Sequence, residues 1–211
     1  MRTGYVQFLQ RVADRYQPDR IVHIGDLVDN HAISYHERLP GLSSAKDEFK
    51  KARKQIKMLV DAFPKANWLI GNHDALTERQ ATSVGLPTEV LKSYNEIWDV
   101  PWTVHDRFSE VLIDGVVYMH GEGPSGMYAH GNRAKARRRS VVMGHLHSNA
   151  GVIWDASPDD RIFGLAVGCG VDNTKLQFLY GKATPRKPIL GCGVVIDGKR
   201  AFFEPWLLPS R

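Results

Sequence analysis

Apolar residues in the first half of the chain alternate between a helical spacing and short unbroken runs. Around Phe8 and Val12 they recur every three or four residues, which predicts an amphipathic helix that ends before Pro18. The short apolar runs are instead typical of buried strands. The helices expected in this half span 5–16, 49–63, 76–84 and 87–98, and the expected strands span 21–24 and 68–70.

The second half carries mostly strand-like patterns separated by turns. Asp114-Gly115 and Asp197-Gly198 favour tight hairpins, since Asp-Gly pairs supply the positive backbone angles that such turns need. Besides a basic helix over 128–138, the strands expected here span 111–113, 116–119, 140–143, 151–154, 162–167, 190–196 and 201–203. The pattern predicts an α/β fold in one domain over 1–211, a layered α-β-β-α sandwich with two mixed central sheets and flanking helices.

Composition places the chain among globular proteins. Of its 211 residues, 43% are hydrophobic and 24% charged, which excludes a mostly disordered chain. The net charge of +5 favours anionic partners such as phosphate compounds or nucleic acid. We expect no membrane-spanning helix, no export signal and a cytoplasmic location. Cys169 and Cys192 are expected to be buried free thiols, as in a reducing compartment.

Potential metal ligands directly follow four of the strand-like runs. The four loops are Gly25–Asp29, Gly71–Asp74, His120–Gly121 and Gly144–His147. Because open α/β sheets place their sites at the ends of strands, these side chains are expected to meet. Imidazole nitrogens with carboxylate and amide oxygens suit manganese, iron, zinc or nickel. The two imidazoles of the last loop share a face in an extended backbone, so they can serve one ion or two neighbouring ions.

In this order, the loops resemble the calcineurin-like metallophosphoesterase family. The family pattern has five blocks: Asp-x-His, Gly-Asp-x-x-Asp, Gly-Asn-His-Asp/Glu, a lone His and Gly-His-x-His. Four of the five blocks are present between Gly25 and His147. The stretch from Asp29 to Glu37 is similar to the small phosphoesterases encoded by bacteriophages.

What the resemblance implies is a phosphoesterase with two metal ions about 3.5–4 Å apart, which clamp a phosphate ester and a bridging hydroxide that attacks phosphorus. By the same resemblance, Asp26 would bridge the ions. Asn72, His120 and His145 would complete the shell of one ion. His147 would belong to the other ion.

Three further roles come from the resemblance. His73 would stand over the phosphate, where it would stabilise the developing charge or protonate the leaving oxygen. Asp74 would orient the ring of His73. Asp29 would contact the metal ligands without binding a metal ion itself.

One block of the family pattern, Asp-x-His on the first strand, is missing from this sequence. The first core strand therefore looks absent, and a truncated start of the chain is the favoured explanation. The alternative is a rebuilt site, in which His31 or His36 stands in, or a site that holds one ion. Both histidines are also explained as surface or substrate-side residues.

Basic residues near the motifs suggest contacts with substrate. Arg79 is a candidate ligand of the substrate phosphate. Arg137 and Arg138 belong to a basic run for which a solvated helix face is the favoured interpretation, and contact with a nucleic-acid backbone is the alternative.

The sequence thus predicts a metal-dependent phosphoesterase that acts on phosphate esters, with phosphodiesters, including DNA or RNA, as the first hypothesis. Two alternatives stay open: a phosphomonoesterase or small-nucleotide hydrolase, and a nucleic-acid-binding or scaffold relative that has lost one metal site. The expected cofactor is one or two divalent ions per chain, manganese first, with zinc, iron, nickel or magnesium as the other candidates.

Overall fold

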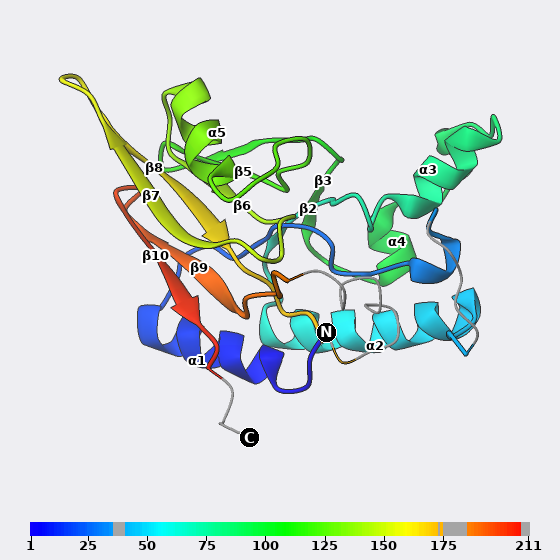
Figure 1. The fold of residues 1–211 in the computed structure, drawn as a ribbon. Helices are drawn as coiled ribbons and strands as arrows, with labels where there is room; N and C mark the ends of the chain where they lie inside the picture. The colour runs from blue at the N-terminus through cyan, green and yellow to red at the C-terminus, as the bar shows by residue number, and fades with distance from the viewer. Residues whose placement is uncertain (36–40, 173, 175–184, 208–211) are drawn as a thin grey trace.

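Short sheets form the centre of the molecule, for which a computed structural model describes residues 1–35, 41–172, 174 and 185–207 (Figure 1). A parallel sheet has the order β1-β2-β3, a mixed sheet has the order β4-β5-β6-β8-β7, and β9 and β10 form an antiparallel hairpin. The strands are β1 (Val22–His23), β2 (Asn67–Leu69), β3 (Thr103–His105), β4 (Val111–Ile113), β5 (Val116–Met119), β6 (Val141–Met143), β7 (Ala150–Ala156), β8 (Arg161–Val167), β9 (Gly191–Ile196) and β10 (Arg200–Pro205).

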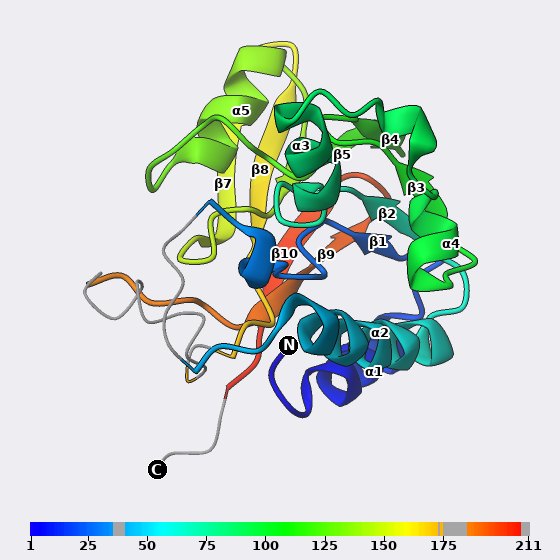
Figure 2. The same cartoon turned by 90° about the vertical axis from the view of Figure 1, so that its right-hand side faces the viewer.

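Helices cover the sheets from two sides. In both ribbon views α1 and α2 lie together on one side of the strands, whereas α5 lies on the opposite side over β7 and β8 (Figures 1 and 2). The helices are α1 (Tyr5–Tyr16), α2 (Ala45–Ala62), α3 (Leu76–Ser83), α4 (Tyr94–Trp98) and α5 (Ala129–Arg137), with 3-10 turns at His31–Ile33 and Thr88–Val90. This layering confirms the predicted α/β sandwich.

Both predicted hairpins are present, and their turns have the expected backbone. Asp114 and Gly115 connect β4 to β5 with φ values of 49° and 77°. Asp197 and Gly198 connect β9 to β10 with φ values of 53° and 63°. These positive angles suit the type of turn that matches the twist of paired strands.

Two details differ from the sequence-based expectation. The helix expected over 87–98 is interrupted, because Leu91 and Ser93 are extended and Ser93 starts α4 with a capping box to Glu96. The strand β3 was missed, since its three residues form no apolar run. With β3 beside β2, the described strands of this sheet are all parallel rather than mixed.

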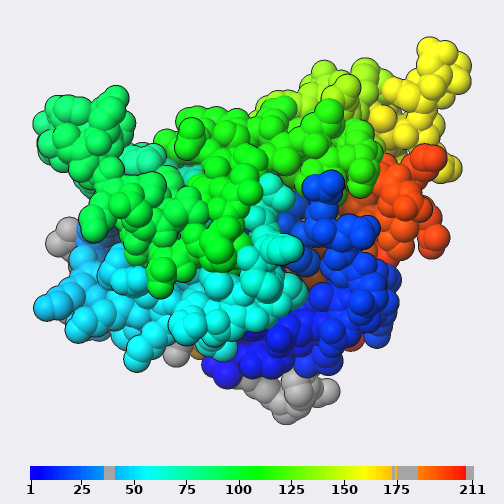
Figure 3. All heavy atoms as spheres, turned by 180° about the vertical axis from the view of Figure 1, so that it is seen from behind, coloured from blue at the N-terminus to red at the C-terminus, as the bar shows by residue number. Residues whose placement is uncertain are grey.

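Three apolar clusters form the core of the described part of the chain. One contains the buried Trp68 and Ile56, a second contains Phe163 and Leu165, and a third contains Met143. The rear view shows the blue N-terminal segment against both the cyan α2 and the orange-red hairpin (Figure 3). None of the described helices is long and apolar enough to cross a membrane.

Two histidines are buried away from the motifs. His130 is buried in α5, where the helix packs closely on β7 and β8. His23 is buried in β1 with its ring 4.4 Å from that of Trp102, and its Nε2 has no hydrogen-bond partner in the described part of the chain. Burial lowers the pKa of His23 to about 4, because no partner compensates its charged form.

His23 predicts a specific acid sensitivity of the fold. The unfolded chain protonates this ring near pH 6.5 and the folded chain only near pH 4, so the free energy of unfolding falls as the pH drops through that window. Between pH 7 and pH 4 the loss attributable to His23 is about 3 kcal/mol. Urea unfolding of the native protein and His23→Leu at both values measures it. An equal loss in both proteins would contradict the assignment.

Candidate metal centre

The four motif loops meet at the carboxyl ends of parallel strands. Asp26 follows β1 and Asn72 follows β2, while His120 and His145 follow the parallel pair β5 and β6. Potential ligand atoms of Asp26, His120 and His145 all lie within 4.8 Å of one another. Parallel strands end at one edge of their sheet, which explains why loops so distant in sequence converge.

Asn72 lies in the middle of this group. Its Oδ1 is 3.0 Å from Nε2 of His120 and 2.9 Å from Nδ1 of His145. The same Nε2 is 3.3 Å from Oδ2 of Asp26, and the two imidazole nitrogens are 3.2 Å apart. Asp26, Asn72, His120 and His145 are called the four-donor cluster below.

The hydrogen bonds of His120 fix what its ring presents to the cluster. Its Nδ1 lies 2.7 Å from the carbonyl oxygen of Ile24, so this nitrogen carries the proton and donates it. In the neutral ring, Nε2 then turns a lone pair toward oxygens of Asp26 and Asn72. Burial lowers the pKa of His120, but the hydrogen bond and the charge of Asp26 raise it above its usual value, so the cluster favours a proton on Nε2 when no ion is bound. With that proton removed, four electron-rich atoms face one another, and this arrangement needs a positive charge between them. A divalent cation that prefers nitrogen and oxygen ligands fits this donor set.

The pKa values of Asp26 and His145 also favour binding of a cation by the cluster. Burial opposes ionisation of Asp26, yet hydrogen bonding to His120 and the charges of His120 and His73 lower the pKa of Asp26 to about 2. Burial lowers the pKa of His145, and neighbouring His120 lowers it further. An ionised carboxylate beside a neutral imidazole is the protonation state in which these residues bind a metal ion.

The backbone of the cluster is held in unfavourable conformations. Asp26 has a φ of 55° and His145 a φ of 62°, in the left-handed region that residues with a side chain seldom adopt. Such conformations persist at functional sites only where the surroundings enforce them. Gly71 gives the required space, since a Cβ there would lie 2.7 Å from the ring of His120.

Asp74 fixes the loop that carries Asp26 through buried hydrogen bonds. Its buried carboxylate accepts hydrogen bonds from backbone N–H groups of Asp26 at 2.7 Å, Gly71 at 2.9 Å and Val28 at 3.1 Å, and from the Trp68 indole at 3.2 Å. Burial and the charge of Asp26 raise the pKa of Asp74 to about 7, although the N–H groups favour its ionised form. The carboxylate thus ties the loop after β1 to the loop after β2.

The role predicted for Asp74 is therefore wrong, because its oxygens are engaged with these N–H groups. Asp29 orients the ring of His73 instead: Nδ1 of His73 lies 2.9 Å from the Asp29 carbonyl oxygen and 3.3 Å from its Oδ1. Burial alone would lower the pKa of His73, but the Asp29 hydrogen bond and the Asp26 charge raise it to about 9. The His73 backbone N–H also donates to Asp26 at 2.9 Å.

The remaining predicted histidines are placed differently. His147 lines the same cavity as Asp26 and His73, but it is outside the group of three ligands, which is the one such group among the described residues. His31 is buried, with its backbone N–H bound to Glu48 at 2.9 Å, and the structure does not bring it to the cluster. His36 lies outside the described residues.

The structure places the predicted basic residues in two different environments. Arg79 is beside the site, because its guanidinium donates to the Asn72 carbonyl oxygen at 3.2 Å. Arg137 pairs with Glu110, and Arg138 pairs with Asp155 and Asp160. These surface carboxylates account for the two charges of α5, so the solvated helix face is the better interpretation of the basic run.

Sequence reasoning missed the ion pair of Arg107 and Glu122. Arg107 donates to both carboxylate oxygens of Glu122, at 2.8 and 2.5 Å, next to the loop that carries His120. Glu122 belongs to the Gly-rich stretch 121–126. Its proximity to His120 in the sequence was the available signal, whereas nothing in the sequence pointed to Arg107.

The contacts of Asp74 predict a large effect on stability. In Asp74→Ala, three backbone N–H groups and the indole of Trp68 lose a buried partner, so the free energy of unfolding should fall by about 3 kcal/mol or more. The control Asp61→Ala removes an exposed carboxylate paired with Lys57 and should cost less than about 0.5 kcal/mol. Urea denaturation compares the two. Equal losses would mean that Asp74 does not hold the loops.

Comparison with known proteins agrees with this geometry. The family model for calcineurin-like phosphoesterases matches residues 3–178, which include all four motif loops. A search of curated proteins finds no match to the chain. Family membership implies a phosphate-ester substrate and divalent metal ions. On the strength of the family match, the chain belongs to the calcineurin-like phosphoesterases, and the activity that this family implies is metal-dependent hydrolysis of phosphoesters.

Proposed function

We propose that this chain holds one divalent cation at the four-donor cluster and hydrolyses phosphodiesters there. The observation that carries the proposal is the convergence of four electron-rich atoms, in which Nε2 of His120 faces both Asn72 and Asp26 within 3.3 Å. A cation between them satisfies all four atoms, and the strained backbone at Asp26 and His145 keeps the donors in place.

Charge balance favours a diester over a monoester. A divalent ion beside the single carboxylate of Asp26, with neutral Asn72, His120 and His145, leaves one net positive charge in the cluster. A phosphodiester carries one negative charge at neutral pH, whereas a phosphomonoester carries up to two. The net charge of +5 on the chain adds a general attraction for polyanions such as DNA or RNA.

When bound, the cation supplies Lewis-acid chemistry, which activates water and neutralises the phosphate. The protein residues do the rest. His73 presents Nε2 to the cavity, because Asp29 engages Nδ1, and a proton held at Nε2 can pass to the leaving oxygen. Asp26 accepts the His73 backbone N–H, which fixes the spacing between the cluster and this proton donor.

The donor set ranks the candidate ions. Two imidazoles, one carboxylate and one amide give mixed nitrogen and oxygen ligation without thiolate, which suits manganese, iron or zinc better than magnesium. We place manganese first. Cys169 and Cys192 are free and contribute to no ligand group among the described residues.

Single substitutions separate metal binding from proton transfer. Asp26→Asn and His145→Ala should each lower manganese affinity at least about tenfold, whereas His73→Gln should keep the ion and lose about 10²-fold or more in kcat. His105→Gln is the matched control, since the His105 ring is hydrogen-bonded to the Asn67 side chain and, among the described residues, to no member of the cluster. Elemental analysis gives metal per chain, and hydrolysis of bis(p-nitrophenyl) phosphate gives the rate.

A different experimental result would contradict each part of the proposed function. Two ions per chain would contradict the single site, and manganese bound equally well by Asp26→Asn would contradict the ligand assignment. Faster hydrolysis of p-nitrophenyl phosphate than of the diester would contradict the substrate class. Metal binding with no hydrolysis of either ester would instead favour a binding protein.

A further inference from the structure

A polar groove lies next to the metal centre, along α3. Its volume is about 410 Å³, within the range of about 300–1,000 Å³ that is typical of small-molecule sites. The side chains that line it include Tyr35, Arg79, Thr82, Ser83, Thr88 and Arg107. Guanidinium groups, hydroxyl groups and an aromatic ring in one groove suit a ligand that is both anionic and aromatic.

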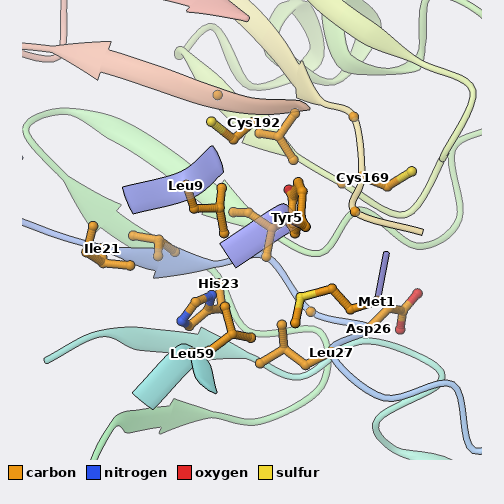
Figure 4. A pocket seen from close by; sticks show the side chains of 18 of the residues that line it. Met1, Tyr5, Leu9, Ile21, His23, Asp26, Leu27, Leu59, Cys169 and Cys192 are labelled. Carbon is orange, nitrogen blue, oxygen red and sulfur yellow. The ribbon is translucent and has the colours of Figure 1, made fainter. Parts of the chain in front are cut away.

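A larger cavity of the molecule has a different character. It has a volume of about 880 Å³ and also reaches Asp26 (Figure 4). The side chains that Figure 4 shows around it are mostly apolar, such as Leu9, Ile21 and Leu59. A phosphate group loses its hydration against apolar walls and gains no partner there. The polar groove is therefore the better complement to a charged substrate.

Arg79 connects the groove to the four-donor cluster. One N–H of its guanidinium donates to the carbonyl oxygen of Asn72 at 3.2 Å, and the side chain of Asn72 belongs to the cluster. Among the described residues no carboxylate forms an ion pair with Arg79. A guanidinium has five N–H donors in a planar fork that matches phosphate oxygens, so donors of Arg79 remain for a substrate phosphate.

Tyr35 places an exposed aromatic ring beside this guanidinium. The residue is 58% exposed, and the Arg79 guanidinium carbon lies 5.2 Å from the centre of the ring. The Gln80 side chain donates to the Ile33 carbonyl oxygen at 2.7 Å, which ties α3 to the segment that carries Tyr35. Tyr35 and Arg79 are called the Tyr35–Arg79 platform below. An exposed ring of this kind offers stacking surface to a nucleobase.

The two other charged side chains of the groove have protein neighbours of their own. Arg107 is paired with Glu122 through two N–H groups, at 2.8 and 2.5 Å. Burial and the charge of Glu78 raise the pKa of Tyr94, which places the Glu78 carboxylate near the buried Tyr94 hydroxyl. Arg79 is therefore the cation of the described groove that is left for an anionic ligand.

We propose that the Tyr35–Arg79 platform holds the nucleotide next to the scissile phosphate of a single-stranded nucleic acid. Tyr35 stacks on an unpaired base, and Arg79 binds the phosphate that adjoins it. This assignment rests on the proposed function, because it names the strand on either side of the hydrolysed diester. Stacking requires a base that is free of a duplex, and every base has a face that can stack, so the platform selects single strands without selecting a sequence.

Binding to two strands that differ only in their bases tests the platform. The first is an oligothymidylate of about eight nucleotides with phosphorothioate linkages, which resist hydrolysis, and the second has the same backbone with tetrahydrofuran in place of every base. Isothermal titration calorimetry on the manganese-loaded chain gives both dissociation constants. The native chain should bind the first strand at least about fivefold more tightly, because the second has no base to stack.

Substitutions of Tyr35 locate this preference. Tyr35→Leu removes the ring and should bind the two strands equally, whereas Tyr35→Phe keeps the ring and should keep the preference. Trp154→Leu is the matched control, since it removes an exposed aromatic ring on β7, at the opposite end of the molecule from α3 (Figure 1). It should keep the preference of the native chain.

A substitution of Arg79 tests the phosphate contact. Arg79→Gln should weaken binding of both strands alike and lower the slope of log affinity against log salt concentration by about 0.7, the value for one phosphate contact on a single strand. Its manganese content, measured by elemental analysis, should equal that of the native chain.

Four results would overturn the assignment of the platform. They are equal binding of the two strands by the native chain, a preference for bases that survives in Tyr35→Leu, an unchanged salt slope in Arg79→Gln, and a loss of manganese in Arg79→Gln, which would place this arginine in the metal centre instead. Calorimetry needs no turnover, so these results are distinct from failure of the proposed function, which is the absence of hydrolysis of bis(p-nitrophenyl) phosphate.

Discussion

The buried carboxylate of Asp74 connects the loop after β1 to the loop after β2, which carry Asp26 and Asn72. It holds the backbone of Asp26 and of Gly71 at once, so Asp26 keeps a left-handed conformation that its own preferences disfavour. Asp26 in turn fixes the backbone of His73, and Asp29 fixes the ring. A chain of hydrogen bonds therefore runs from the core to His73, the proposed proton donor.

This arrangement explains why the ligands need not be near one another in sequence. Short parallel strands deliver Asp26 with Asn72 from one sheet, and His120 with His145 from another. The Ile24 carbonyl then sets the tautomer of His120 across the gap between those sheets. The cluster is thus built as much by main-chain groups as by its ligands, which is how proteins commonly tune metal affinity.

Much of the fold and of the cluster was predictable from sequence, and the failures at the site share one cause. Asp-Gly turns and helical periodicity located the hairpins and the long helices, and strand-end motifs located the four-donor cluster, because these signals are local. The roles of Asp74 and Asp29 were exchanged, since which carboxylate reaches which N–H depends on how two loops pack. For the same reason the Arg107 pair with Glu122 and the surface pairs of Arg137 and Arg138 were not foreseen.

We expect four side chains of this protein to hold one cation. Anomalous X-ray scattering from crystals grown with manganese tests it most directly, because it locates the ion without any assumption about activity. We expect one strong peak per chain, within ligand distance of Asp26, Asn72, His120 and His145. A peak centred on other residues, two peaks of equal strength or no peak at saturating manganese would contradict it.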